Sequence, residues 1–184
     1  MTQFAQCIIK ALARFKRDDR GVAATEIALL LPLMVSLYFG VVQLSQAVSA
    51  RSNVTLTART VSDLVSRVTT INNADMTNAL NASAAVMAPF PVTNLKVTVS
   101  SVTIDANGKA TIAWSDSLNG SARAVGSVVT LPTALNVAST SLIWAEVQYA
   151  YTPTIGYVIT GTLTLKDDMY MGPRVSNSVA RTAT

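Results

Sequence analysis

Few residues in this chain are of a type and spacing that could do chemistry. None of the 184 residues is histidine, which removes the commonest acid–base side chain and the commonest transition-metal ligand. The single cysteine, Cys7, cannot form a disulfide within the chain. Asp167 and Asp168 are adjacent, but nothing near them in sequence would divide them into an acid and a base, so we interpret them as a solvated turn. We expect no enzymatic activity, no metal and no cofactor.

The sequence Asp105-Ala-Asn107-Gly108 is similar to part of a calcium-binding loop. The later ligand positions and the final glutamate of such a loop are missing, so we expect a tight turn instead. Asn-Gly is the typical dipeptide of a type I′ hairpin turn, because both central positions of that turn need positive φ. The sequence therefore predicts a β-hairpin here.

Gly21 and Glu26 are the pair that most invites a functional interpretation. Gly21 ends a basic segment, and no side chain in residues 27–50 carries a formal charge. That run is long enough to span a bilayer, since about 20 mostly apolar residues cross a hydrocarbon core of roughly 30 Å. A carboxylate at the start of such a helix is costly unless it is paired. Glu26 could therefore lie among the headgroups beside the helix dipole, or it could pair with a positively charged group.

This arrangement resembles the class III leader of type IV pilins and pseudopilins, which a membrane-embedded peptidase cuts after glycine, leaving glutamate as the fifth mature residue. The wider pattern is similar to that of the TadE/TadG-like family of the tight adherence (Tad) pilus machinery and reads Gly21-x-x-x-x-Glu26-x-Ala28-Leu29-x-x-Pro32-Leu33. The resemblance implies a prepilin peptidase that cuts between Gly21 and Val22. It also implies that Glu26 pairs with the new amino group of Val22, in its own chain or a neighbour.

The resemblance implies a non-enzymatic pseudopilin or minor pilin that acts in assembly of a tight adherence pilus of the type IVb, Flp class. Its partners would be the membrane, the peptidase and other pilin-like subunits. The chain is larger than the very short major Flp pilins, and 184 residues leave no room for the large extra module of TadG-like members. Two alternatives stay open: an uncleaved signal-anchored envelope protein whose outer β domain binds a partner, and a secreted adhesin or binding module with such a leader.

The positive charge is concentrated at the N-terminus. Residues 1–21 contain five basic and two acidic side chains, and so hold +3 of the net charge of +4. A basic flank on one side of a span is retained in the cytoplasm. We therefore expect a protein of the bacterial inner membrane, with a cytoplasmic N-terminus and a periplasmic C-terminal domain, or a subunit incorporated into a surface pilus. The same distribution argues against a nucleic-acid partner, and we expect no small-molecule substrate.

Pro32 lies inside the expected membrane helix. Proline removes one backbone hydrogen bond, which membrane helices tolerate, and we expect a kink there. After Leu44 apolar residues recur every three or four positions as far as Val68, which predicts that the helix continues in amphipathic form. A second short helix is expected over residues 74–88, with Asp75 as its N-cap or as an acid in its first turn.

Alternation of apolar and polar residues predicts strands beyond residue 91. Leu95, Val97 and Val99 alternate with polar residues, and Ser100-Ser101 shifts the pattern as a bulge would. Residues 115–140 read as an exposed loop with a short helix or strand. The strongest strand pattern covers residues 143–151, and a final hairpin partner is expected from Ile155 through Leu165, continuing to Met171, before a polar tail.

These patterns predict the fold class α+β, with a long N-terminal transmembrane-to-amphipathic α-helix followed by a small antiparallel β-sheet domain. The expected divisions are a basic prepilin-type leader (1–21), a transmembrane helix (22–48), an amphipathic helical connector (49–90) and an extracytoplasmic antiparallel β domain (91–184).

Overall fold

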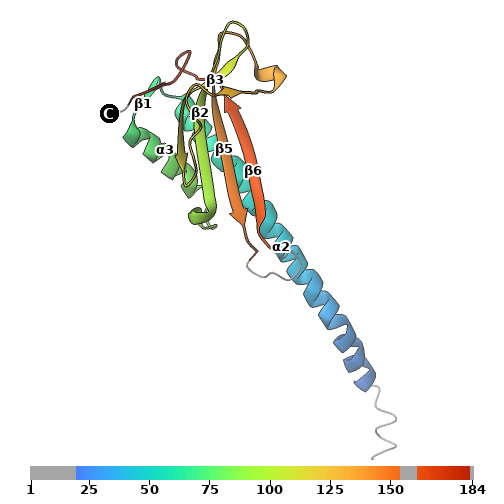
Figure 1. The fold of residues 1–184 in the computed structure, drawn as a ribbon. Coiled ribbons are helices and arrows are strands. Elements are labelled where there is room, and N and C mark those ends of the chain that lie inside the picture. The colour runs from blue at the N-terminus through green and yellow to red at the C-terminus, as the bar shows by residue number, and fades with distance from the viewer. Residues whose placement is uncertain (1–19, 154–160, 183–184) are drawn as a thin grey trace, which may run out of the picture.

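The structure, a computed structural model, describes residues 20–153 and 161–182. One long helix, α2 (Arg20–Ser66), carries a compact body on its C-terminal half, while its N-terminal half protrudes alone (Figure 1). The body combines a second helix with a five-stranded antiparallel sheet. The expected α+β fold class is confirmed. Of the expected leader, residues 1–19 lie outside the described residues.

Helix α2 contains 47 residues, which corresponds to about 70 Å at 1.5 Å per residue. From Gln43 onward one side of the helix is buried against the body. The apolar buried residues recur at helical spacing and are Ala47, Ala50, Val54, Ala58, Val61 and Val65. The alanines let the helix backbone approach the sheet closely. The amphipathic continuation is thus confirmed, although the helix ends at Ser66, two residues before the predicted Val68.

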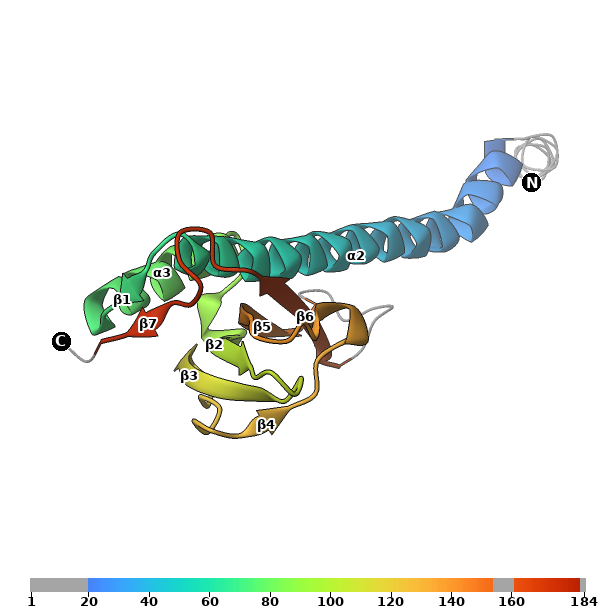
Figure 2. The same cartoon turned by 90° about the horizontal axis from the view of Figure 1, so that it is seen from above.

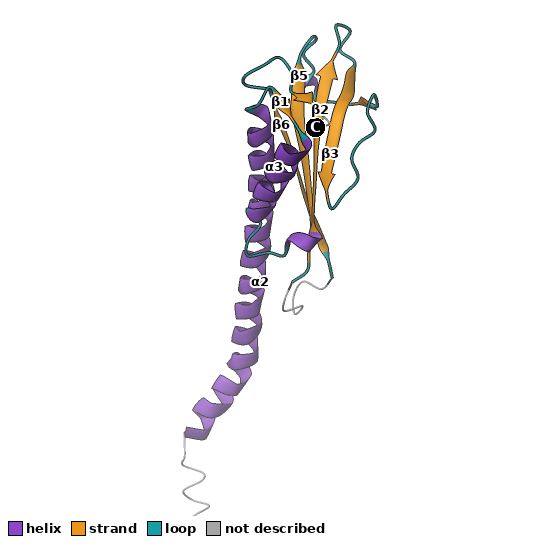
Figure 3. Cartoon of the chain, turned by 90° about the vertical axis from the view of Figure 1, so that its left-hand side faces the viewer, coloured by secondary structure: helices purple, strands orange, loops and turns teal. Residues whose placement is uncertain are grey.

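Helix α3 (Asn73–Ala85) packs beside α2 (Figure 3). Its N-cap is Asn72, whose side-chain oxygen accepts a hydrogen bond from the backbone N–H of Asp75 at 2.8 Å. Asp75 therefore takes the second of its two predicted roles, the acid in the first turn. Met76, Leu80 and Ala84 are buried on one face of α3.

The sheet has the strand order β4-β3-β2-β5-β6, and every neighbouring pair is antiparallel. The strands are β2 (Leu95–Ile104), β3 (Ala110–Leu118), β4 (Val128–Val129), β5 (Ser141–Tyr151) and β6 (Leu163–Met171). The register between β2 and β3 shifts between Ser101 and Val102, where the bulge was predicted, but the unpaired residue is Ala113 on β3. Strand β2 itself pairs with β5 without interruption, so the predicted bulge at Ser100-Ser101 is wrong. One face of β5 and β6 lies on α2, so the sheet covers the helix on one side only (Figure 2).

The β2–β3 hairpin is confirmed, but its predicted type I′ turn is wrong. Of the two central residues only Gly108 has positive φ, at 79°. The side chain of Asp105 instead accepts hydrogen bonds from the backbone N–H groups of Asn107 at 2.8 Å and Lys109 at 2.9 Å. Hydrogen bonds from the backbone to an aspartate side chain stabilise this turn, so the type I′ geometry is not needed.

Asp167 and Asp168 do not form a turn, contrary to the prediction. Both lie within β6, with Asp167 opposite Val147 and Asp168 opposite Glu146. Strand β6 is at the edge of the sheet, where charged residues are common because they discourage pairing with other chains. The described strand covers Leu163–Met171. Residues 155–160 of the predicted hairpin partner lie outside the described residues.

The C-terminal tail forms a strand that the sequence did not predict. β1 (Thr70–Ile71) and β7 (Ala180–Arg181) pair in parallel as a separate two-stranded sheet. The carbonyl of Val179 accepts a hydrogen bond from Nε1 of Trp114 at 2.7 Å. The tail therefore ties the junction of the two helices to β3. Two short 3₁₀ helices complete the described elements, η1 (Val92–Asn94) and η2 (Thr133–Leu135).

Candidate assembly site on the N-terminal helix

Gly21, Val22, Glu26 and Pro32 all lie on the protruding half of α2, and none of them contacts the body. All four are exposed. Val22 and Glu26 are four residues apart, so they lie on the same side of the helix, separated by about 6 Å along its axis. Pro32 lies roughly 9 Å beyond Glu26. The structure thus places the predicted processing and pairing residues within the first two turns of one exposed helix.

The fold itself does not require a glycine at position 21. A Cβ atom built there would meet nothing within 4 Å, and the residue does not have a positive φ. Glycine in a helix is less favourable than alanine by about 1 kcal/mol. Packing and backbone conformation therefore do not account for Gly21.

Glu26 forms no ion pair with any residue that the structure describes. Its neighbours on the helix are apolar and exposed, among them Ile27 and Leu30. Near the start of a helix a carboxylate interacts favourably with the helix dipole. An exposed carboxylate within an apolar surface nevertheless favours a positively charged partner once that surface leaves water.

Helix α2 bends in its N-terminal part (Figure 2), and Pro32 lies inside the helix. Because proline has no N–H, the carbonyl of Ala28 loses its usual partner. Oγ of Ser36 donates to the carbonyl of Pro32 at 2.7 Å, a contact that often accompanies helix bending. That Pro32 causes the bend stays a prediction.

The protruding half of α2 is apolar on all sides. Exposed apolar side chains follow one another around the helix, and include Leu29, Leu31, Leu33, Met34, Leu37, Tyr38 and Val41. Among the described residues α2 is the one helix that is long and apolar enough to cross a membrane. A helix apolar all round is covered either by lipid or by other protein.

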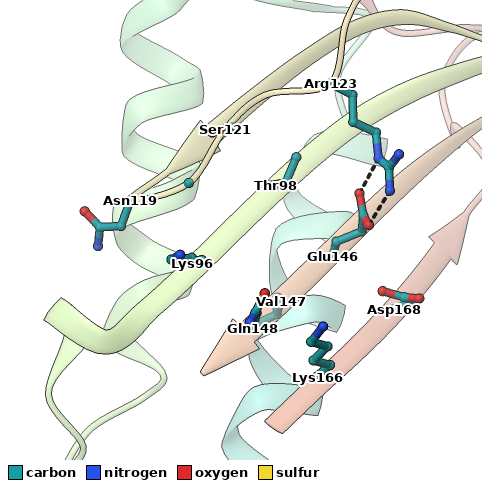
Figure 4. Close-up of a pocket in the computed structure, with 11 residues that line it drawn as sticks. Lys96, Thr98, Asn119, Ser121, Arg123, Glu146, Val147, Gln148, Lys166 and Asp168 are labelled. Carbon is teal, nitrogen blue, oxygen red and sulfur yellow. Dashed lines mark hydrogen bonds and ion pairs between the residues drawn. The ribbon is translucent and has the colours of Figure 1, made fainter. Parts of the chain in front are cut away.

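A second candidate site lies on the sheet face opposite α2, where a polar groove of about 500 Å³ opens (Figure 4). Across it Arg123 forms a two-pronged ion pair with Glu146, with both N–O distances at 2.6 Å. The Arg123 guanidinium also lies 4.1 Å from the ring centre of Trp144, which stacks on Tyr170 at 5.5 Å.

Arg123, Glu146 and Asp168 lie close enough in this groove to influence one another electrostatically. The hydrogen bonds that Arg123 donates to Glu146 raise the pKa of Arg123, so its guanidinium stays charged. Burial, and then the negative charges of Glu146 and Asp167, raise the pKa of Asp168. Within the described residues no group of three or more His, Cys, Asp or Glu side chains could hold a metal. The groove offers no activated nucleophile and reads as a polar surface held together by Arg123.

Sequence reasoning missed this cluster. Alternation along β5 predicts that Trp144 and Glu146 lie on one face. The position of Arg123 could not be predicted, because residues 115–140 show no periodic pattern. Asp116 was missed for the same reason. It accepts two hydrogen bonds from Arg181 of the tail, at 2.8 and 3.2 Å.

The comparisons with known proteins concern the helix and not the sheet. Residues 21–63 match the family model described as TadE-like protein. The match begins at Gly21 and contains Glu26, Pro32 and most of the helical surface that packs on the body. No curated protein and no solved structure matches the chain significantly. Over residues 21–63 the chain is therefore similar to the TadE-like family, which is associated with the tight adherence pilus.

Proposed function

We propose that this chain is a pseudopilin or minor pilin, a non-enzymatic subunit used to assemble a tight adherence pilus. The observation that carries the proposal is that the family match begins at Gly21 and includes the whole exposed half of α2. A helix that protrudes from the body with apolar side chains on every side can be buried in a bilayer first and among other pilin-like helices later. The same element then serves as a membrane anchor and as an assembly surface.

Processing by a prepilin peptidase would occur between Gly21 and Val22. Support comes from the glycine, which neither packing nor backbone conformation requires. A requirement set by another molecule, such as the binding site of a peptidase, accounts for a glycine that the fold does not need. The basic residues before Gly21 would remain in the cytoplasm, with the body in the periplasm.

Glu26 would pair with the amino group that cleavage creates at Val22. Within one chain the two groups lie one turn apart on the same side of α2. A neighbouring subunit could supply the amino group instead. Either pairing removes the cost of an isolated carboxylate in an apolar layer.

The test is to determine the N-terminus of the full chain after co-expression with a cognate prepilin peptidase. We expect a mature chain that starts at Val22, and an intact chain when Gly21 is changed to alanine. Gly172→Ala is the matched control, because a Cβ there also meets nothing within 4 Å, and this variant should be cleaved normally. An intact leader in the unaltered chain would overturn the proposal and favour an uncleaved, membrane-anchored protein whose outer domain binds a partner.

A further inference from the structure

A second groove, of about 490 Å³, lies where the body meets the protruding half of α2. One wall is the helix, at Ser45, Gln46 and Ser49. The other wall consists of the segment before β2 and the end of β5, with Phe90 and Tyr151. In Figure 1 β5 ends and β6 begins at this end of the body, beside α2. The groove is therefore at the boundary between the exposed and the packed part of the helix.

The length of the helix fixes the depth of this groove in a membrane. From Val22 to Gln43 the helix rises about 32 Å, close to the thickness of a hydrocarbon core. Ser45 and Ser49 follow at about 3 and 9 Å beyond that point. If the apolar half spans the bilayer, the groove lies at the level of the phospholipid headgroups, whichever way the chain is oriented.

The groove lining suits the polar part of a lipid. None of the described residues that line it is charged, and most present a hydroxyl, an amide or an aromatic ring. They are Ser45, Gln46, Ser49, Pro89, Phe90, Pro91, Asn94, Tyr149, Tyr151 and Thr152. Phe90 packs edge-on against both tyrosines, with ring centres 6.2 and 6.1 Å apart. Tyrosines are typical of the membrane interface because one end of the ring is polar.

One residue that lines this groove has a polar group without a partner. Tyr151 is 3% exposed, and its hydroxyl is buried without a hydrogen-bond partner among the described residues. A buried hydroxyl left in this way is unfavourable by about 1–3 kcal/mol. Natural proteins rarely leave such a group unpaired unless a ligand or water completes it.

We propose that this groove binds the glycerol-phosphate part of a phospholipid, with the Tyr151 hydroxyl donating to a phosphate or ester oxygen. Because the lining carries no charge, the groove recognises the part that all phospholipids share and does not select for an anionic headgroup. The body would thereby be seated on the membrane surface. This inference rests on α2 spanning the membrane, and depends neither on cleavage after Gly21 nor on pilus assembly.

The test is native mass spectrometry of the full chain, released from nanodiscs made of equal parts of phosphatidylethanolamine and phosphatidylglycerol. We expect one retained phospholipid per chain, of either headgroup. Tyr151→Phe, which removes a single oxygen atom, should lower retention about five-fold, the factor that one ordinary hydrogen bond contributes. Ser49→Trp should abolish retention because the indole fills the groove.

Tyr170→Phe is the matched control, since Tyr170 lies on β6 and stacks on Trp144, outside the groove. This variant should retain lipid as the unaltered chain does. Gly21→Ala should also retain it, so failure of the cleavage proposal and failure of this one are distinguishable. If the unaltered chain retains no phospholipid, or Tyr151→Phe retains as much as Tyr170→Phe does, the inference is overturned. Tyr151→Phe removes only one oxygen atom and should fold, so it tests phospholipid binding even if Ser49→Trp does not fold.

Discussion

The two halves of helix α2 have the same secondary structure and opposite surroundings. In residues 43–66 one stripe of small and β-branched side chains is buried against α3 and the sheet. In residues 21–42 apolar side chains are exposed on every side. Contacts within the chain explain why the packed half is apolar on one side. The apolar surface of the protruding half is explained only by a bilayer or by other proteins outside the chain. The family match crosses this boundary, since it runs from residue 21 to residue 63.

The largest expected effect comes from a charge placed on the buried stripe of the packed half. Val61 is fully buried, whereas Leu56, one and a half turns earlier, is 49% exposed. Val61→Asp should destabilise the body by more than about 4 kcal/mol, because an unpaired carboxylate would be buried against the sheet. Leu56→Asp should change the stability by less than about 0.5 kcal/mol. Chemical denaturation in detergent, followed by tryptophan fluorescence, measures both. Equal effects would mean that the stripe is not what holds the body on the helix.

The contrast between the halves also shows how much could be predicted from the sequence. Periodicity was sufficient for α2, because its apolar run and the stripe from Val54 to Val65 are local patterns. It was also sufficient for the central strands, where Ile143 and Val147 alternate with polar residues. The site residues Gly21, Glu26 and Pro32 could be identified from the sequence because their spacing along a single helix is what distinguishes them.

Pairings between distant segments could not be predicted. Trp114 and Val179 are 65 residues apart, and neither lies in a pattern that indicates the other. The sequence indicates only a polar tail, because the two-residue strand β7 is too short to show alternation. The phospholipid groove was missed for a similar reason, since Ser49 and Tyr151 meet only once β5 is packed on α2.

The anchor of this tail provides the next test of the packed half. Arg181 is partly buried, and it donates hydrogen bonds to Asp116, to the Ile71 carbonyl and to Asn73. Arg181→Ala should destabilise the body by about 2 kcal/mol, because several charge-assisted hydrogen bonds are lost and Asp116 stays behind unpaired.

Arg174→Ala is the matched control for the tail, because Arg174 pairs with Asp63 while its side chain is 53% exposed. An ion pair so open to solvent contributes about 0–1 kcal/mol. Urea titrations of both variants would show the difference in midpoint. If Arg174→Ala lowered the urea midpoint more than Arg181→Ala does, the first residues of the tail, and not β7, would hold it to the body.

A substitution in the protruding half should change the shape of α2 without changing the stability of the body. Pro32→Ala restores the N–H that the Ala28 carbonyl lacks, so α2 should straighten. Spin labels at Thr25→Cys and Ser45→Cys, in a Cys7→Ser background, would then lie about 30 Å apart along the axis, as in a straight helix. Before the change the backbone separation should be shorter by a few ångströms because of the bend. The unfolding midpoint of the body should not move. If the distance between the spin labels did not change, Pro32 would not be the cause of the bend in α2.

The smallest expected effect contrasts two acids that face each other across β5 and β6. Glu146 is held by Arg123, whereas Asp168 lies opposite it without an ion pair among the described residues. Burial first, and then the charge of Glu146, raise the pKa of Asp168 above its ordinary value. A raised pKa in the folded state means that protonated Asp168 favours folding, and that this contribution is lost as the pH rises through the raised pKa.

Asp168→Asn should therefore stabilise the body at neutral pH by a few tenths of a kcal/mol, a small value because Asp168 is exposed and solvent screens it. The difference from the unaltered chain should vanish below the ordinary pKa range of aspartate, where both side chains are neutral. Glu146→Gln should act in the opposite direction, because it removes the partner of Arg123. Thermal unfolding of the three proteins between acid and neutral pH measures these differences. If Asp168→Asn were destabilising at neutral pH, Asp168 would be the acid that the polar face of the sheet depends on, and Arg123 would be shared between the two strands.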